Sequence, residues 1–381
     1  PFGTIFINAL KLIAMPLILG SLIKGVSDLK DISKLSIMGG RTIGIYLFTT
    51  VLAVIIGLIL VNTIAPGNSI TESTRNDLMA TYEGNAKEKV DVASKQKESG
   101  PLQPLVELVP DNIFAATTSN INMLQVIFFA IFFGIALILI PEKKAKPVKD
   151  FFDSFNDVIL KFIDLIMITA PYGIFALLAA LVVESPSLDL FRALGMYAVT
   201  LIIGLVLLIF VYMILVKLFT GKSPMFFMKG ISPAQLVAFS TSSSAATLPV
   251  TMERVEKHLG VDKEVSSFVL PIGATINMDG TSVYQAVAAV FIAQAFGMDL
   301  SISTQLGIIV TASLASIGAA AVPSAGMIML VIVLGQAGIP EAGLALIFAV
   351  DRPLDMCRTI TNISGDATVS MLVAKSMGKL N

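Results

Sequence analysis

The sequence contains few of the residues from which catalytic and metal sites of soluble proteins are usually built. Its 381 residues include one cysteine, one histidine and no tryptophan, and only 14% of them are charged, whereas 55% are hydrophobic. This composition excludes a disulfide framework and a Cys/His metal site, and a formal net charge of −1 argues against nucleic-acid binding. So little charge cannot cover a soluble domain, which predicts a polytopic membrane protein.

The first half of the chain consists of apolar segments long enough to cross a bilayer. They span residues 4–27, 42–65, 121–140, 151–183 and 190–219. Lysines and arginines crowd residues 24–41, 143–149 and 217–229, so the positive-inside rule places these connections in the cytoplasm. The polar residues 66–102 are predicted to be an external loop without a site. Pro1 leads directly into an apolar segment without signal-peptide features, and we expect residues upstream of it.

Two later apolar segments are each interrupted by small residues followed by a proline. The first break contains Ser242-Ser243-Ser244 before Pro249, and the second runs from Ser316 to Pro323. Halves of about 12 to 15 residues are too short to cross a bilayer, so residues 225–257 and 303–335 are predicted to be re-entrant helical hairpins. Backbone groups freed at such breaks are tolerated where they are buried in protein or line a cavity. The hairpin tips therefore indicate a ligand site.

Each predicted hairpin is followed by a long apolar helix that carries Asn and Asp together. Residues 262–296 contain Asn277 and Asp279, and residues 340–377 contain Asn362 and Asp366. The charge pattern predicts that the two hairpins start from opposite sides of the membrane. The second half of the chain would then be an inverted repeat. Paired interrupted segments of this kind are typical of the binding site of a secondary transporter.

The serine run at the first tip has more than one interpretation. Small residues allow close helix packing in membranes, whereas free N–H groups at a half-helix N-terminus attract a carboxylate. A catalytic serine is disfavoured because His258 is the only histidine and no nucleophile elbow accompanies the run. We therefore predict that the protein is not an enzyme.

Residues 351–366 place an unusual density of charge in an apolar segment. At 100° per residue, one helix face carries Asp351, Asp355, Arg358, Thr359, Asn362 and Asp366, and Arg352 falls just outside it. A lone charge at a bilayer centre costs roughly 2.5 to 3.5 kcal/mol, so such charges need solvent, partners or ligands.

These polar groups suggest two kinds of ligand. Arg358 can hold a carboxylate bidentately while Asp355 binds an ammonium group, which describes a receptor for an acidic amino acid; the alternative is an internal ion pair. Asn277, Asp279 and Asp366 offer oxygen ligands for desolvated cations, with freed backbone carbonyls as further ligands, although a buried Asn can also serve packing alone. The carboxylates favour at least two cations.

The motifs resemble those of the glutamate transporter family, the dicarboxylate/amino acid:cation symporters. The resemblance rests on the serine-rich tip before Thr247-Leu248-Pro249, on residues 277–281, on the second tip at 318–326 and on residues 355–366, in order along essentially the whole chain. It implies an all-α fold of eight membrane helices and two hairpins, with inverted repeats. Residues 1–65 would be helices 2 and 3, residues 103–219 helices 4 to 6, and residues 220–381 the transport core. The first helix is absent from this sequence.

The resemblance further implies a homotrimer that works by an elevator mechanism, with sodium as coupling ion and no other cofactor. Matching positions assign sodium to Tyr46, Thr49, Thr50, Gly273, Thr275, Asn277, Asp279, Ser316, Ile317, Ala319, Asn362 and Asp366. They assign the substrate to Ser243, Met278, Thr281, Val322, Gly326, Asp355, Arg358, Thr359 and Asn362.

The chain also departs from its relatives. It has Ser242 and Met356 at the two positions where archaeal and animal members respectively place an arginine, and Arg352 is a possible auxiliary substrate residue in their place. Gln285 replaces the proton-carrying Glu of animal members, and Met278 favours sodium over protons. We therefore predict sodium-coupled symport of aspartate or glutamate in a bacterial or archaeal inner membrane. A C4-dicarboxylate or neutral amino acid symporter and an ion channel are the alternatives.

Overall fold

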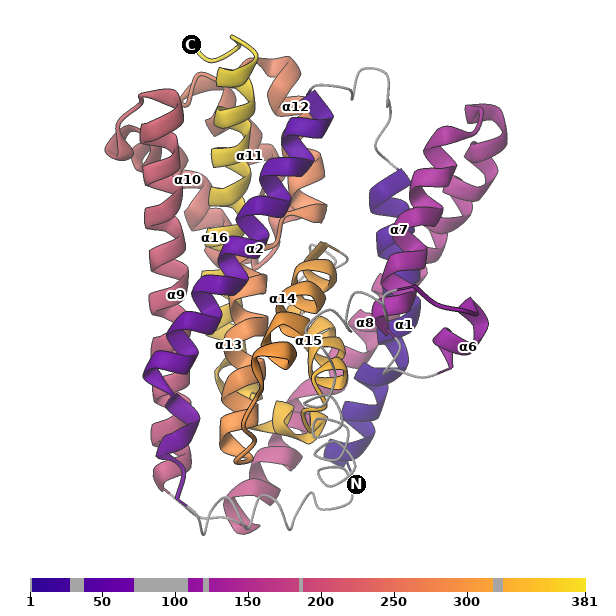
Figure 1. Cartoon of the computed structure of the whole chain (residues 1–381), viewed down its shortest axis with the longest axis vertical. Coiled ribbons are helices and arrows are strands. Elements are labelled where there is room, and N and C mark those ends of the chain that lie inside the picture. The colour runs from indigo at the N-terminus through magenta and orange to yellow at the C-terminus, as the bar shows by residue number, and fades with distance from the viewer. Residues whose placement is uncertain (1, 28–37, 72–108, 119–122, 185–187, 318–324) are drawn as a thin grey trace.

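The computed structural model describes residues 2–27, 38–71, 109–118, 123–184, 188–317 and 325–381. The described residues form helices and connections without a β-sheet, apart from an isolated antiparallel bridge between Val261 and Leu380 (Figure 1). This confirms the predicted all-α class. In the part of the chain that the structure describes, two helical stretches, Met38–Ser69 and Phe191–Thr220, are long and apolar enough by themselves to cross a membrane, and three shorter apolar helices accompany them.

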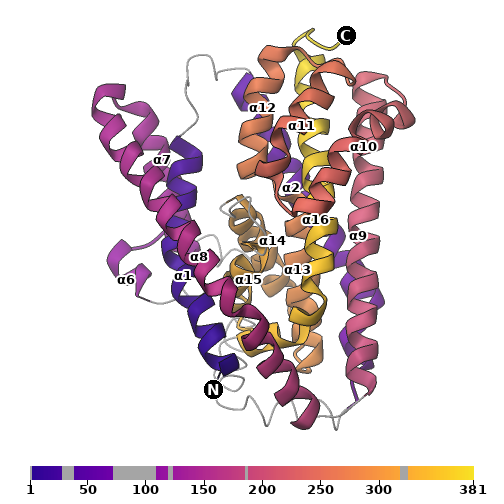
Figure 2. The ribbon, with the colours of Figure 1, turned by 180° about the vertical axis from the view of Figure 1, so that it is seen from behind.

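One side of the molecule is formed by α1 (Phe2–Ser27), α7 (Met123–Leu139) and α8 (Glu142–Glu184), with the short α6 (Ile113–Thr117) beside them (Figures 1 and 2). The prediction that α8 begins at residue 151 is wrong, because the Lys-rich segment forms its first turns. Ion pairs from Lys146 to Asp150 and from Lys149 to Glu142 support those turns, and both are spaced to lie along one helix.

The other side contains α2 (Met38–Ile64), followed by the 3-10 turn η1 (Pro66–Ser69), and α9 (Leu188–Thr220). Large apolar side chains such as Phe48, Ile59, Phe210 and Leu218 are exposed on these helices. Exposed apolar side chains along two long helices are what a lipid-facing surface requires.

The two interrupted segments form helical hairpins, as the fold prediction states. The first consists of α10 (Pro224–Thr241) and α11 (Ser244–Lys257), and the second of α14 (Ile302–Ile317) and α15 (Ala325–Gln336). The first occupies the upper half of the molecule and the second the lower half, so they approach the middle from opposite ends (Figures 1 and 2). The second predicted tip, residues 318–324, lies outside the described residues.

The first hairpin is followed by α12 (Lys263–Ile276) and α13 (Asp279–Ala295), and the second by the turn η3 (Glu341–Gly343) and α16 (Leu344–Ser376). The prediction of a single helix over 262–296 is wrong, because Asn277 and Met278 have extended or irregular backbone angles and separate α12 from α13. The break is stabilised from outside, since the backbone N–H of Gly280 donates a hydrogen bond to Asn362 Oδ1 (2.8 Å).

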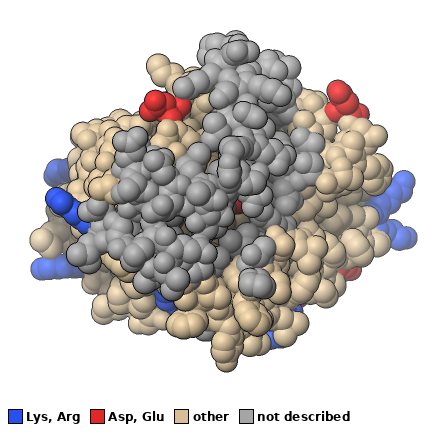
Figure 3. All heavy atoms as spheres, turned by 90° about the horizontal axis from the view of Figure 1, so that it is seen from below, with Lys and Arg blue, Asp and Glu red and all other residues tan. Residues whose placement is uncertain are grey.

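Basic residues gather at one end of the molecule. There α1 ends, α2 begins, α7 passes into α8, and α9 passes into α10 (Figures 1 and 2). The described cations near these termini include Lys24, Arg41, Lys143, Lys144, Lys146, Lys149, Lys217, Lys222 and Lys229. Seen from the opposite end, the described lysine and arginine atoms in view lie at the margin (Figure 3). The positive-inside rule predicts that this basic end faces the cytoplasm.

The C-terminal residues form hydrogen bonds with another connection at this basic end. The backbone N–H of Asp262 donates to Lys379 O (3.0 Å) and that of Asn381 to Gly260 O (2.9 Å). Lys379 also forms an ion pair with Glu264, whose hydrogen bond raises the pKa of the lysine. The end of α16 is thereby attached to the connection between α11 and α12.

Candidate functional site

The polar face predicted for residues 351–366 lies on α16 and faces the protein interior. Asp351, Asp355, Arg358, Asn362 and Asp366 are all buried, whereas the Arg352 side chain is 57% exposed. Helical periodicity alone identified this face, because positions on one helix are fixed by its pitch. Its partners on other helices divide it into two parts with different electrostatics.

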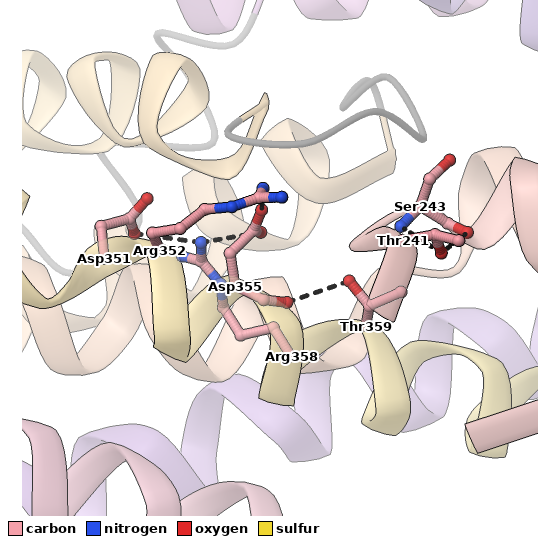
Figure 4. Close-up of polar contacts among 7 residues, drawn as sticks. All are labelled: Thr241, Ser243, Asp351, Arg352, Asp355, Arg358 and Thr359. Atoms are coloured by element: carbon pink, nitrogen blue, oxygen red, sulfur yellow. Dashed lines mark hydrogen bonds and ion pairs between the residues drawn. The ribbon is translucent and has the colours of Figure 1, made fainter. Parts of the chain in front are cut away.

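The first part is centred on Arg358. Its Nη2 donates to Asp355 Oδ1 (2.8 Å) and to Asp351 Oδ1 (3.0 Å) (Figure 4). Its guanidinium carbon lies 3.8 Å from the centre of the Tyr284 ring. The Nε and Nη1 atoms of Arg358 have no hydrogen-bond partner among the described residues. An arginine held by two carboxylates and a ring keeps donors available for a further acceptor.

Arg352 approaches the same cluster from its exposed edge. Its Nη1 lies 3.6 Å from Asp355 Oδ2, whereas the Thr359 hydroxyl donates to the backbone carbonyl of Asp355 (2.9 Å) (Figure 4). Asp355 is thus contacted by both arginines. The long, exposed pair with Arg352 contributes far less than the buried pair with Arg358.

The first hairpin tip lies next to this cluster (Figure 4). Ser243 is the N-cap of α11, where its hydroxyl accepts a hydrogen bond from the N–H of Ala246 (3.2 Å). Ser242 precedes it in the left-handed conformation, with φ of 52°, which turns the chain between α10 and α11. The tip therefore directs the N-terminus of a 14-residue helix toward the polar face, a suitable arrangement for an anion.

Three of the other predicted substrate residues are described. Met278 and Thr281 are buried at the break between α12 and α13. A side-chain carbon added to Gly326 would lie 2.9 Å from Thr281 Cγ2 and 3.6 Å from Arg358 Nη1, so this position on α15 faces Arg358 across a narrow gap. Val322 lies outside the described residues.

The second part of the polar face surrounds Asp366 and Asn277. Asn277 Nδ2 donates to Asp366 Oδ1 (2.9 Å), while Asn277 Oδ1 is buried without a partner among the described residues. A side-chain carbon on Gly273 would collide with the Tyr46 hydroxyl and with the Asp366 carboxylate, so glycine leaves a small oxygen-lined space there. Asn362, whose Oδ1 accepts from Gly280, connects this part to the substrate side.

Asp279 is buried nearby and is contacted from two other helices. Its Oδ1 accepts from the Thr50 hydroxyl of α2 (2.7 Å), and its Oδ2 accepts from the Tyr212 hydroxyl of α9 (2.6 Å). In the same region the hydroxyls of Thr49 and Tyr46 donate to backbone carbonyls, those of Tyr46 and Val269 respectively. Predicted positions from α2 and α13 are thus brought together.

The remaining predicted cation ligands lie at helix ends. Ser316 is buried and donates its hydroxyl to the Ser313 carbonyl (2.9 Å), Ile317 is the last residue of α14, and Thr275 lies in the last turn of α12. Backbone carbonyls in a last helical turn lack partners within their own helix. Ala319 lies outside the described residues.

The donor set of the second part fits a hard monovalent cation. Asp279 and Asp366 are fully buried, and the side chains that donate hydrogen bonds to them are neutral. Desolvated carboxylates require compensating positive charge, and carboxylate, amide and carbonyl oxygens are ligands of hard cations. The unpartnered Asn277 oxygen and the space at Gly273 supply an acceptor and room for such an ion.

The sequence did not indicate the roles of three residues that lie on this face or near it. Asp351 was placed on the polar face but given no site role, and Tyr284 and Tyr212 were not considered. The tyrosines stand in apolar helices, where an isolated Tyr is also an ordinary interface residue. Their partners are distant in sequence, so only a tertiary structure could identify them.

The fold and the polar face together define a membrane carrier of the broken-helix type, with buried charges between two opposed hairpins. The family model of the sodium:dicarboxylate symporter family matches residues 1–376, and the chain belongs to this family. Excitatory amino acid transporter 3 of Oryctolagus cuniculus is 38% identical over 98% of this chain and 78% of its own length. The proton/sodium-glutamate symport protein of Geobacillus stearothermophilus is 34% identical, over 100% of this chain and 88% of its own. An excitatory amino acid transporter of Caenorhabditis elegans is 38% identical over 96% and 78%.

Proposed function

We propose that this protein is a secondary active transporter that couples the uptake of an acidic amino acid, aspartate or glutamate, to sodium. The observation that carries the proposal is the division of one buried face of α16 into an arginine-centred cluster and a region of carboxylates with neutral donors. The first suits a ligand with its own carboxylates, and the second suits cations. Family membership and the names of the relatives support the same function.

For the substrate, Arg358 would bind the side-chain carboxylate through Nε and Nη1, the donors that have no partner among the described residues. Asp355 would turn from Arg358 toward the ammonium group, while Asp351 stays with the guanidinium. The N-terminus of α11 at Ser243 would bind the backbone carboxylate. The other proposed contacts are Met278, Thr281, Val322, Gly326, Thr359 and Asn362, with Arg352 as an auxiliary charge.

For sodium, Asp366, Asn277, Asn362 and Gly273 would form one site. Asp279 would form a second with Tyr46, Thr49, Thr50 and Asn277, and a third would use backbone carbonyls of Thr275, Ser316, Ile317 and Ala319. Asn277 would serve two of the sodium sites and Asn362 both a sodium site and the substrate, so cation binding would order a residue that also meets substrate. Such a shared ligand couples the two binding equilibria.

The proposal extends to assembly and motion. Residues 220–381 would form a transport core that moves across the membrane against the remaining helices in a homotrimer, with the second hairpin as external gate. Residues 1–65 and 103–219 would supply the scaffold and the helices that accompany the core, and residues 66–102 an external loop. The support is the family resemblance, and an inner membrane is the proposed location.

Uptake into proteoliposomes tests the function. Labelled aspartate and glutamate should accumulate under an inward sodium gradient and not under a proton gradient alone, because Gln285 carries no titratable group in the buried α13. Unlabelled succinate and alanine, added as competitors, distinguish a C4-dicarboxylate or neutral amino acid carrier. Uptake that is indifferent to sodium would refute the proposal, and sodium flux that continues without substrate would favour a channel.

A further inference from the structure

We propose that Tyr212 is a positioning residue for the cation site at Asp279, an inference that rests on the proposed sodium coupling. Tyr212 lies on α9, outside the hairpins and helices from which the predicted ligands come. Its side chain is fully buried, and its hydroxyl donates to Asp279 Oδ2 at 2.6 Å. That distance is in the range of a charge-assisted hydrogen bond.

The two oxygens of Asp279 accept hydrogen bonds from two different helices. Thr50 on α2 donates to Oδ1 and Tyr212 on α9 donates to Oδ2, while Asp279 itself begins α13 directly after the break in the chain. A carboxylate at a helix end, next to the irregular Met278, would otherwise be free to rotate. The two donors therefore fix the plane of the carboxylate.

The Tyr212 hydroxyl lies in a narrow space beside α16. A carbon added to Gly365 on α16 would lie 2.9 Å from this hydroxyl and 2.8 Å from Asn277 Nδ2. Glycine at position 365 thus leaves the space through which Tyr212 reaches the region between α13 and α16. The hydroxyl borders both Asp279 and the amide that holds Asp366.

The two donors differ in what they leave available. Thr50 is itself a proposed sodium ligand, so its hydroxyl oxygen and Oδ1 can face the same ion. The phenol of Tyr212 donates to Oδ2, so that oxygen already has a hydrogen-bond partner. Oδ1 is then the oxygen presented to a cation, before the cation arrives, which is the preorganisation that ion sites require.

The test measures sodium binding without transport. Purified protein is heated in detergent without substrate over a range of sodium concentrations, with choline chloride added to keep the ionic strength constant. Sodium that binds the folded state raises the melting temperature, and a fit of this rise gives the sodium concentration that half-saturates the folded protein, called the sodium midpoint below. Tyr212→Phe keeps the ring and removes the hydroxyl, and we expect its sodium midpoint to rise about tenfold, the loss of one such hydrogen bond.

Tyr197→Phe is the matched control. Tyr197 lies on the same helix, is equally buried and stacks on Phe291, and its hydroxyl has no partner among the described residues. This variant should keep the wild-type sodium midpoint. In an Asp279→Asn background, Tyr212→Phe should produce no further rise, because the acceptor it orients has already been changed.

The outcomes separate this inference from the proposed function. A wild-type protein without any sodium-dependent stabilisation would overturn both. A wild-type response together with an unchanged midpoint in Tyr212→Phe would overturn only the role of Tyr212, including when the variant melts lower at every sodium concentration. A rise of equal size in Tyr197→Phe or in the Asp279→Asn background would also overturn it.

Discussion

The two halves of the polar face of α16 solve the problem of buried charge in different ways. Around Arg358 the protein supplies both signs, since one guanidinium is shared by Asp351 and Asp355 and lies over the Tyr284 ring. Around Asp279 and Asp366 it supplies only neutral donors, from Thr50, Tyr212 and Asn277. In the first half the positive and negative charges largely compensate each other. In the second half these contacts leave the negative charge of the carboxylates uncompensated.

This difference explains how one helix can serve two ligands. A zwitterionic substrate can enter a cluster of mixed sign by exchanging partners, with little change in total charge. Under the proposed function, a cation would enter the second half because the buried carboxylates there would gain the positive charge that their neutral partners do not supply. Changes in the first half should therefore alter substrate recognition and stability, whereas changes in the second should alter the dependence on sodium.

The largest effect is expected from Arg358→Met. The change leaves Asp351 and Asp355 buried without their cation, and breaking a buried ion pair in this way costs about 3 to 5 kcal/mol of stability. Aspartate uptake in proteoliposomes should fall at least about 100-fold, the same order of free energy. Thermal unfolding of the purified variant measures the stability, and uptake that stays within about tenfold of wild type would contradict the assigned role.

Asp366→Asn should have the next largest effect, on sodium rather than on the substrate. The amide keeps the shape of the side chain and removes the charge, so the sodium concentration for half-maximal uptake should rise on the order of 30-fold, as for a lost charge-assisted interaction of about 2 kcal/mol. Uptake as a function of sodium at saturating aspartate measures this. A variant with a raised aspartate KM and an unchanged sodium dependence would reverse the division between the two halves.

Gly273→Ala tests the space in the second half. The added carbon would collide with the Tyr46 hydroxyl and the Asp366 carboxylate, so the sodium midpoint should rise about tenfold if these groups shift by a fraction of an ångström. Gly44→Ala on α2 is the matched control, because an added carbon there meets no atom within 4 Å. Equal behaviour of the two variants would show that the space at Gly273 is not used.

The smallest effect is expected at the exposed edge of the first half. Arg352→Ala removes a mostly exposed partner 3.6 Å from Asp355, and such pairs contribute about 0.2 to 1 kcal/mol, so the aspartate KM should change less than about fivefold. Combining it with Ser242→Arg should leave transport working. Measured uptake constants for the two variants decide this, and an inactive double mutant would count against Arg352 as a substitute charge.

Some features of the two halves could be predicted from local sequence, and others could not. The polar face of α16 and the two hairpins follow from local rules, namely helical pitch and interruptions by small residues and proline. The break at Asn277 was mistaken for continuous helix because apolar residues surround it and its stabilising contact, Gly280 to Asn362, spans 82 residues. The role of Tyr212 depends on a contact over 67 residues, which no local pattern indicates.

The attachment of α2 has a practical consequence for measuring motion. Arg41, near its start, donates to the Ser376 carbonyl (2.7 Å) at the end of α16, and Thr50, farther along, donates to Asp279. Under the proposed motion, a helix that is hydrogen-bonded to the core at two points would move together with it. Spin labels on α2 and α16, introduced after replacement of the single cysteine, Cys357, therefore give a reference distance that should stay constant. The distance between a second pair of labels, on α2 and α8, would change if the core moves, and the α2–α16 distance would serve as its reference.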